Sequence, residues 1–218
     1  AFWGSTTGLI SVIFAPCPVI ISFSGSDLIG TRNLSGRFTL GGIFNKIVSN
    51  LVSRMTAANI TKSKEMKFIL PKSAQFKTEV IPNGVNQKKF YPIKNSIAKK
   101  KLGLENCIDY ILFFYTEGQH VKNNKMAMEV FRLIKDTRPN TEIIIATNIA
   151  HEDLIYYYNS CSVMIITSFH EGSNNSVKEA IACDLPIVTV NVGDVKERLE
   201  NKRHCYVTNS YDILLFSN

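Results

Sequence analysis

The chain contains the stretch Thr167-Ser-Phe-His-Glu-Gly-Ser-Asn-Asn-Ser-Val-Lys-Glu-Ala-Ile-Ala-Cys-Asp-Leu-Pro186, which runs from an apolar segment through a polar loop into a segment of helical periodicity. This order, strand then loop then helix, is how parallel α/β sheets build ligand crevices at the carboxyl ends of their strands. The helix is expected to begin near residues 173–176. Its first backbone N–H groups have no partner within the helix and suit a phosphate or a diphosphate. Gly172 allows the backbone to approach a ligand closely.

Two acids of this stretch, Glu171 and Glu179, are candidates for ligand chemistry. Glu171 precedes the expected helix and Glu179 lies about one turn inside it, so their carboxylates can flank one molecule from different depths. Ionised carboxylates accept hydrogen bonds from vicinal hydroxyls, such as those of a sugar or a ribose, but repel a phosphate that lies equally close. The alternative is that Glu171 interacts with the helix dipole and Glu179 faces solvent.

Outward from this stretch, short β-rich runs alternate with segments of helical period in both halves of the chain, which predicts an α/β fold with parallel sheets. The expected strands are residues 18–23, 56–60, 79–82, 108–115, 141–147, 163–167, 186–190 and 204–207. The expected helices are residues 40–55, 63–68, 124–137, 151–159, 176–183 and 194–200. The first of these helices is amphipathic, with Lys46 and Arg54 on its polar face and six apolar residues on the other, Ile43, Phe44, Ile47, Val48, Leu51 and Val52.

Residues 87–101 are rich in lysine, contain Pro92 and hold little apolar content, as in a linker between domains. We therefore predict a first Rossmann-like domain over residues 1–92, a linker over 93–106 and a second Rossmann-like domain over 107–218.

Charge is divided unevenly along a chain of 218 residues that has a formal net charge of +7. Residues 1–104 carry 15 Lys/Arg and 3 Asp/Glu, whereas residues 105–218 carry 10 and 15. The first half is thus expected to face an anionic partner, either a membrane surface or a phosphorylated acceptor. A merely solvated basic face is the alternative. Nucleic acid is not expected, because no nucleic-acid-binding motif accompanies the basic residues.

The composition, 45% hydrophobic and 20% charged, is that of a globular protein. Pro16 and Pro18 interrupt the longest apolar stretch, so no transmembrane segment is expected. The five cysteines form no Cys-x-x-Cys pair and are expected to be reduced core residues in the cytosol, and no metal site is expected. The chain opens at Ala1 without an initiator Met or a signal peptide, and we expect it to be a fragment.

Several of these motifs resemble family-four retaining glycosyltransferases of the GT-B fold. The resemblance begins with Glu171 and Glu179, which are separated by seven residues and followed by a run of small and apolar residues. It extends over most of the chain. The similar segments are Ala-Ile-Ala-Cys-Asp-Leu-Pro-Ile-Val at 180–188, Val-Gly-Asp at 192–194, Pro-Asn-Gly-Val-Asn-Gln-Lys-Lys-Phe-Tyr-Pro at 82–92, Tyr-Tyr-Asn-Ser-Cys-Ser at 157–162 and Val-Ile-Ile-Ser-Phe-Ser-Gly-Ser-Asp at 19–27.

The resemblance implies a role for each matched residue. Glu179 binds the ribose hydroxyls, and Glu171 lies beside the donor sugar and its reacting carbon. Lys122 neutralises the diphosphate leaving group, where a point charge stabilises developing negative charge. As a plain helix-flanking lysine, Lys122 would have no such role. The remaining donor-binding residues are Gly172, Ser173 and Ser176, and the acceptor-side cleft of the first domain contains Ser24, Gly25 and Asp27.

Three departures from the family pattern are visible. Glu117 stands where the family usually has an arginine five residues before the lysine, and Ser24 stands where a histidine is common. Asn174 replaces a frequent proline, a change that suits a helix start. The GT-B fold also implies an earlier first strand with a Gly-rich loop and a C-terminal helix that crosses back. Because both are expected outside residues 1–218, the first domain is expected to be partial.

The resemblance predicts a metal-independent enzyme that transfers a sugar from a nucleotide diphosphate sugar, most simply a UDP-sugar, to a glycan or lipid-linked acceptor, as in cell-surface polysaccharide synthesis. The nucleotide sugar is a co-substrate and no cofactor is expected. The location expected is cytoplasmic, on the inner face of the membrane. The first alternative is a non-catalytic nucleotide-sugar-binding module. The second, a nicotinamide oxidoreductase, is disfavoured because no Gly-x-Gly-x-x-Gly follows an expected strand.

Overall fold

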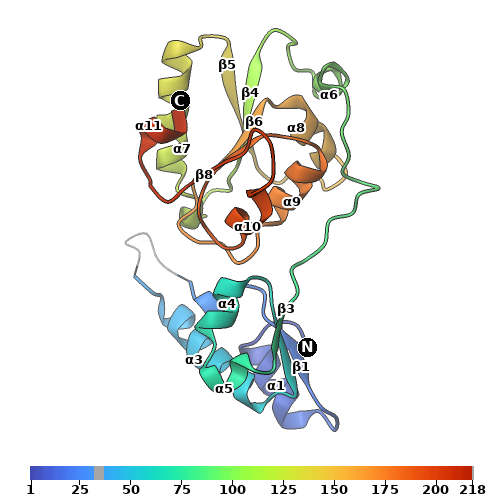
Figure 1. Cartoon of the computed structure of the whole chain (residues 1–218), viewed down its shortest axis with the longest axis vertical. Helices are drawn as coiled ribbons and strands as arrows, with labels where there is room; N and C mark the ends of the chain where they lie inside the picture. Colours follow the sequence, from blue (N-terminus) through green and yellow to red (C-terminus); the bar gives the residue numbers. More distant parts are fainter. Residues whose placement is uncertain (32–36, 218) are drawn as a thin grey trace. The chain divides into compact units, whose positions relative to one another are not determined.

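The computed structural model describes residues 1–31 and 37–217. It divides into two compact units (Figure 1). The first unit holds residues 1–83 together with residues 170–173, and the second holds residues 84–169 and 174–218.

The first unit is built on a three-stranded parallel sheet in the order β1-β2-β3. Its strands are β1 (Ile20–Ser22), β2 (Ala58–Thr61) and β3 (Thr78–Val80). Its helices are α1 (Thr6–Phe14), α2 (Ser26–Ile29), α3 (Leu40–Met55), α4 (Lys64–Ile69) and α5 (Lys72–Gln75). The core of this unit includes the buried side chains of Ile21, Phe23, Leu28, Val52 and Met66.

Helix α3 has the bounds that the periodicity predicts, but it does not bury the apolar face as a whole. Val48 and Val52 are buried, together with Ser49 and Ser53 on the same side of the helix. Ile47, from the expected apolar face, is 63% exposed. The contact partners explain the difference: Ser49 donates a hydrogen bond to the carbonyl of Asp27 at 2.8 Å, so the small polar residues face the unit's interior.

The second unit is built on a five-stranded parallel sheet in the order β5-β4-β6-β7-β8. Its strands are β4 (Asp109–Phe114), β5 (Thr141–Ala146), β6 (Val163–Ile166), β7 (Ile187–Val190) and β8 (Tyr206–Thr208). Its helices are α6 (Asn95–Leu102), α7 (Asn124–Thr137), α8 (Leu154–Ser160), α9 (Asn175–Ala182), α10 (Val195–Leu199) and α11 (Ile213–Ser217), with a 3-10 turn η1 (His120–Lys122). Two parallel sheets crossed by helices confirm the expected α/β class.

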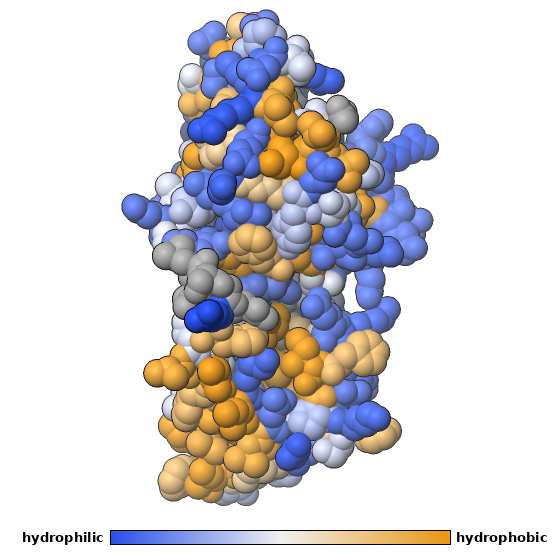
Figure 2. All heavy atoms as spheres, turned by 90° about the vertical axis from the view of Figure 1, so that its left-hand side faces the viewer, coloured by the Kyte–Doolittle hydropathy of each residue, from blue (hydrophilic) through white to orange (hydrophobic). Residues whose placement is uncertain are grey.

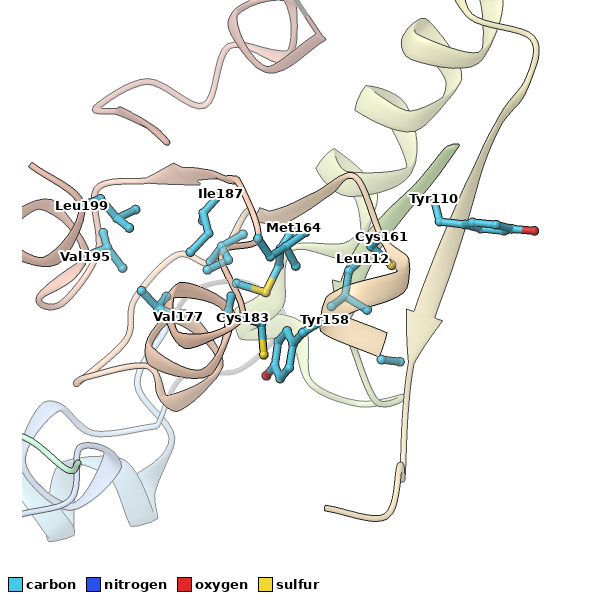
Figure 3. Packing of buried hydrophobic residues seen from close by; sticks show 14 of the residues in the cluster. Tyr110, Leu112, Tyr158, Cys161, Met164, Val177, Cys183, Ile187, Val195 and Leu199 are labelled. Carbon is cyan, nitrogen blue, oxygen red and sulfur yellow. The ribbon is translucent and has the colours of Figure 1, made fainter. Parts of the chain in front are cut away.

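Side chains of β4 alternate between two hydrophobic clusters, because successive residues of a strand point to opposite faces of the sheet. Tyr110 and Leu112 join the larger cluster, which includes Tyr158 of α8 and Val177 of α9 (Figure 3). Ile111 and Phe113 join a second cluster with Ala127, Ile165 and part of α7. Helices therefore cover both faces of the sheet, which explains why its strands read as continuous apolar runs.

The segment expected to be a linker, residues 93–106, contains helix α6 and lies within the second unit. Asn159 of α8 accepts a hydrogen bond from the backbone N–H of Ile93 at 2.6 Å and donates one to the carbonyl of Tyr91 at 3.1 Å. Lys99 is buried and its Nζ donates to the carbonyl of Ile108 at 2.7 Å. Gly103 ends the helix in the left-handed conformation with φ 69°. The lysine-rich composition of this segment therefore did not predict the helix that packs there.

The five cysteines divide between core and surface, so the expectation of core cysteines holds for part of the set. Cys161 and Cys183 are buried, and burial raises the pKa of Cys161 to about 12 and that of Cys183 to about 11. Cys17 and Cys107 are exposed. Burial therefore keeps the two core thiols protonated at neutral pH.

Among the described residues, no helix combines the length and the apolar character needed to cross a bilayer.

We predict opposite effects for two adjacent glycines at the start of α3. A Cβ on Gly42 would lie 2.4 Å from the carbonyl oxygen of Thr31, whereas a Cβ on Gly41 meets nothing within 4 Å. Gly42→Ala is expected to destabilise the chain by about 1–3 kcal/mol through overpacking. Gly41→Ala is expected to stabilise it by about 0.5 kcal/mol, because alanine has less backbone freedom to lose. Thermal and urea unfolding measure both, and shifts of the same sign in the two variants would contradict the packing at Thr31.

Candidate nucleotide-sugar site

A pocket lies where the strand order of the second sheet reverses. The chain passes from β4 to β5 on one side and then returns to β6 on the other side of β4, so the loops after β4 and β6 separate. Such a switch point is where open α/β sheets form a ligand crevice. The pocket is lined by residues from the carboxyl ends of β4 and β6, from η1 and from the start of α9: Phe113, Phe114, Lys122, Ile165, Ile166, Ser168, Asn174 and Ser176.

The loop after β4 is held to the end of β6 by hydrogen bonds that position Lys122. Thr167 is fully buried, and its Oγ1 donates to the carbonyl of Lys122 at 2.7 Å and to that of Asn123 at 3.2 Å. The N–H of Phe169 donates to the carbonyl of Val121 at 2.9 Å. The strand that precedes the expected ligand loop thus fixes the backbone from which Lys122 extends.

Helix α9 begins on the other side of the same pocket with a side-chain cap. Asn174 is the N-cap residue, and its Oδ1 accepts hydrogen bonds from the N–H of Ser176 at 3.0 Å and from its Oγ at 2.7 Å. Asparagine in place of the proline that the family resemblance expects therefore has a local reason, since asparagine satisfies a helix N–H that proline leaves open. Lys122 and Ser176, both predicted to bind the donor, line one pocket.

Glu179 lies further along α9, and a buried side chain of α8 holds its carboxylate. The buried phenol of Tyr158 donates a 2.7 Å hydrogen bond to Oε2 of Glu179. Oε1 lies 3.7 Å from Nε2 of His151, and the glutamate side chain is 14% exposed. Burial of Tyr158, reinforced by the charge of Glu179, raises its pKa far above the ordinary value of 10, so the phenol stays a donor. Glu179 is thus a fixed acceptor and not a solvated surface acid.

The other predicted donor residues, Glu171, Gly172 and Ser173, lie in the loop before α9. Residues 170–173 belong to the first unit, whereas Lys122, Ser176 and Glu179 belong to the second. Glu171 is not among the residues that line the pocket of the second unit, and its role beside the donor sugar stays a prediction.

The predicted acceptor-side residues lie in the first unit, at the turn after β1. Ser24 is exposed. Asp27 is fully buried, and its carboxylate accepts from the N–H groups of Gly4 at 2.7 Å, Ser24 at 3.1 Å and Gly25 at 2.8 Å. Gly25 has a φ of 137°, which suits glycine. Asp27 holds the shape of this turn, whereas Ser24 faces outward.

Sequence reasoning missed Tyr158, His151 and Thr167 as parts of the site. Tyr158 and Thr167 lie within segments that read as structure, because a tyrosine in an apolar helix and a threonine at a strand end are common core residues. His151 lies in the segment before α8, far from Glu179 in the chain. No periodicity or spacing joins these positions, so the signal appears only when the chain is folded.

Among the described residues, no group of three or more His, Cys, Asp and Glu side chains is arranged to hold a metal ion.

Three solved structures show the class of fold. The chain is similar to a sucrose-phosphate synthase from Thermosynechococcus elongatus, with a TM-score of 0.69 and 16% identity over 89% of this chain and 56% of that one. It is similar to the Anabaena protein HepE in complex with UDP-glucose, with a TM-score of 0.66 and 16% identity over 97% and 64%. It is also similar to WaaG, a glycosyltransferase involved in lipopolysaccharide biosynthesis, with a TM-score of 0.67 and 11% identity over 97% and 69%.

At these identities the likeness concerns the fold alone, that of GT-B proteins, and each unit of this chain has a Rossmann-like parallel sheet. Residues 109–216, just under half of the chain, match the model of the family glycosyl transferases group 1. The matched segment contains the whole five-stranded sheet and the pocket between β4 and β6. The chain spans 56% of the length of the synthase and 64% of that of the Anabaena protein. No curated protein sequence matches it as a relative.

We predict that the hydroxyl of Tyr158 stabilises the second unit through Glu179. Tyr158→Phe removes the donor and leaves Oε2 of a 14% exposed carboxylate without this bond. The expected loss is about 1.5–3 kcal/mol, the usual range for a hydrogen bond to a charged group. Tyr157→Phe, at the neighbouring half-buried position of α8, is the control and is expected to change stability by less than about 0.5 kcal/mol. Urea unfolding at neutral pH compares them, and equal losses would refute the bond's importance.

Proposed function

We propose that this chain supplies the nucleotide-sugar-binding unit, and part of the acceptor unit, of a retaining glycosyltransferase. The substrate is a nucleotide diphosphate sugar, with UDP as the favoured nucleotide, and the sugar is transferred to a glycan or a lipid-linked acceptor. The Anabaena structure that this chain resembles holds UDP-glucose, which supports the choice of donor class.

One observation carries this proposal: a cation and a capped helix start share a pocket at the switch point of the sheet, with a fixed carboxylate further along the same helix. Lys122 and Ser176 line the pocket, and the first N–H groups of α9 suit an anion there. Glu179 suits vicinal hydroxyls, since an ionised carboxylate only accepts hydrogen bonds. A nucleoside diphosphate carries the two matching groups next to each other, a diphosphate for the pocket and a ribose for Glu179.

In the proposed reaction the bond between the sugar carbon and the diphosphate breaks, and negative charge develops on the leaving oxygen. Lys122 stabilises that charge without a metal ion. Positive charge develops at the sugar carbon, and Glu171 is assigned to stabilise it, as the family resemblance implies. The acceptor hydroxyl then forms the new bond on the face that the diphosphate leaves, and its proton passes to the departing diphosphate oxygen, so that the configuration is retained.

We place the protein on the cytoplasmic side of a membrane whose lipid or surface glycan supplies the acceptor. A reducing compartment is supported by the cysteines, because all five carry free thiols: Cys17, Cys107, Cys161, Cys183 and Cys205. WaaG, one of the similar structures, is described as involved in lipopolysaccharide biosynthesis, which supports a surface-glycan acceptor.

A second candidate is a module that binds the nucleotide sugar without transferring it. Two observations favour it: Glu117 stands where the family resemblance expects an arginine, and Ser24, in place of a histidine, is an exposed hydroxyl. Release of nucleoside diphosphate from the donor separates the two candidates, because a binding module stabilises the donor complex without consuming it.

The first experiment is a thermal-shift panel of UDP-, GDP- and ADP-sugars with the full chain. A ligand that binds the native state raises the unfolding temperature by mass action. We expect one of the three series of nucleotide sugars to raise the unfolding temperature, and we predict that it is the UDP-sugars. A nicotinamide dinucleotide serves as the negative control. The absence of a shift with every nucleotide would contradict donor binding.

We predict different losses for the two glutamates. Glu179→Gln is expected to weaken binding of both the nucleotide sugar and the free nucleoside diphosphate by about tenfold, because the ribose is held alike in both. Glu171→Gln is expected to lower turnover with little effect on nucleoside diphosphate affinity, since its partner is the sugar carbon. Calorimetric titration of both ligands, together with a donor-consumption assay on a full-length enzyme, measures these effects.

The controls for this pair are changes at exposed residues of the same unit. Glu152→Gln, two residues before α8, and Lys125→Ala, at the exposed start of α7, are expected to leave affinity unchanged. Lys122→Ala is expected to weaken the nucleoside diphosphate more than the nucleoside, because the lost charge faces the diphosphate. Equal diphosphate losses at Glu171 and Glu179 would overturn the two assignments.

A further inference from the structure

His151 lies beside the carboxylate that the proposed function assigns to the ribose. Its Nε2 is 3.7 Å from Oε1 of Glu179, which is farther than a direct hydrogen bond between these atoms. The histidine side chain is 58% exposed, whereas that of Glu179 is 14% exposed. The two side chains therefore meet at the surface without closing a hydrogen bond to each other.

The position of the His151 ring is fixed by packing rather than by that contact. The ring meets Phe90 edge to face, with centroids 5.3 Å apart and planes at 82°. Phe90 is 2% exposed and meets Tyr158 edge to face as well, with centroids 5.8 Å apart. Tyr158 in turn donates the 2.7 Å hydrogen bond to Oε2 of Glu179. Favourable ring contacts thus join His151 to the residue that holds the glutamate.

All four of these residues belong to the second unit, although the chain brings them from separate segments. Phe90 precedes α6, and Glu179 lies on α9. His151 lies in the loop between β5 and α8, and Tyr158 lies on α8 itself. Because the strands are parallel, this loop leaves the same carboxyl edge of the sheet as the loops that form the pocket. The arrangement is therefore contained within one unit, at its candidate site.

The two oxygens of Glu179 differ in their surroundings. Oε2 accepts from the buried phenol of Tyr158, and Oε1 faces His151. An ionised carboxylate only accepts hydrogen bonds, so it binds a hydroxyl through the hydrogen of that hydroxyl. The oxygen of the bound hydroxyl still has lone pairs that suit a donor. An imidazole N–H beside the carboxylate is such a donor.

We infer that His151 is a specificity-determining residue for the ribose of the nucleotide sugar. Its Nε2 donates to the oxygen of the same hydroxyl that donates to Oε1 of Glu179. One hydroxyl oxygen fits within hydrogen-bond distance of both atoms, about 2.7–3.0 Å from each, because the atoms are 3.7 Å apart. A deoxyribose that lacks this hydroxyl leaves both groups without their partner, and such a site discriminates against it. The inference rests on the proposed function, since it takes Glu179 as the ribose acceptor.

Three other interpretations of the pair fit the contacts less well. A plain ion pair would close to hydrogen-bond distance, as Lys135 and Glu142 do at 2.6 Å. A packing role does not require an imidazole, because any aromatic ring can meet Phe90 edge to face. A metal site needs further ligands, and no group of three or more His, Cys, Asp and Glu side chains in residues 1–31 and 37–217 is arranged to hold one.

The test compares recognition of the ribose by the full chain and by variants at this position. His151→Phe keeps a ring beside Phe90 and removes both ring nitrogens. His151→Gln keeps an N–H donor and removes the ring. Glu152→Gln, at the exposed neighbouring position, is the control. Each protein is titrated with UDP, GDP and ADP, and with the 2′-deoxy and 3′-deoxy analogue of each diphosphate.

Calorimetry suits these titrations because the first unit exposes large apolar side chains. Figure 2 shows hydrophobic side chains gathered over the first unit. On α3, Leu40 is 88% exposed, Phe44 52% and Ile47 63%. A hydrophobic dye would bind such a surface in the folded chain, whereas the heat of ligand binding is measured without a dye.

We expect the unchanged chain to bind one ribonucleoside diphosphate at least about tenfold more tightly than one of its deoxy analogues, which corresponds to one net hydrogen bond. In His151→Phe this ratio is expected to fall several-fold, because binding of the ribonucleotide weakens while that of the deoxy analogue is kept. His151→Gln is expected to recover part of the ratio, and Glu152→Gln all of it. A merely structural role would weaken the three ligands alike and leave the ratio unchanged.

The inference is overturned if His151→Phe keeps the ratio of the unchanged chain, or if the unchanged chain binds the ribonucleotide and both deoxy analogues equally. Either result, with the ribonucleotide bound, leaves the proposed function standing. An unchanged chain that binds none of the diphosphates overturns the proposed function as well, so the two failures are distinct. Circular dichroism and melting temperature check that each variant folds, and the ratio measured on the unchanged chain tests the inference without any variant.

Discussion

The pairing of β4 with two neighbours, β5 on one side and β6 on the other, is the constraint on which the second unit depends. Because all three strands run parallel, their carboxyl ends meet at one edge and the connections leave toward opposite faces. The resulting separation of loops leaves room for the pocket between β4 and β6. Thr167 then ties the β6 end to the loop that carries Lys122. The local chemistry of the site follows from this sheet order.

Much of this arrangement could be predicted from the sequence, because most of its apolar runs and helical periods mark elements that the fold buries. Helix α7 has the predicted bounds and the strand runs correspond to strands within a few residues, since each has a continuous apolar signal. Ser176 could be predicted at a ligand loop from its place after a strand, whereas Lys122 was predicted only through the family resemblance, and the folded chain brings both to one pocket. Helix α6 could not be predicted, because buried Lys99 counts as a charge in a sequence and as packed methylenes in the fold.

The orientation of α3 and the hydrogen bond that holds Glu179 could not be predicted from the sequence, for another reason. Periodicity shows that a helix has two faces but not which face meets the core, and in α3 the serine side meets it. The bond between Tyr158 and Glu179 joins residues of two helices, and no pattern within either helix encodes it. Tertiary contacts decide both features.

The bond from Tyr158 to Glu179 also joins the interior of the protein to its surface. Tyr158 packs in the core beside Cys183 of the same region, while the carboxylate that it holds borders solvent (Figure 3). A change in core volume beneath the ring moves the phenol and with it the acceptor oxygen. Substitutions in the core around α8 and α9 are therefore limited to those that keep the carboxylate of Glu179 in place. We expect such substitutions to occur together rather than one at a time.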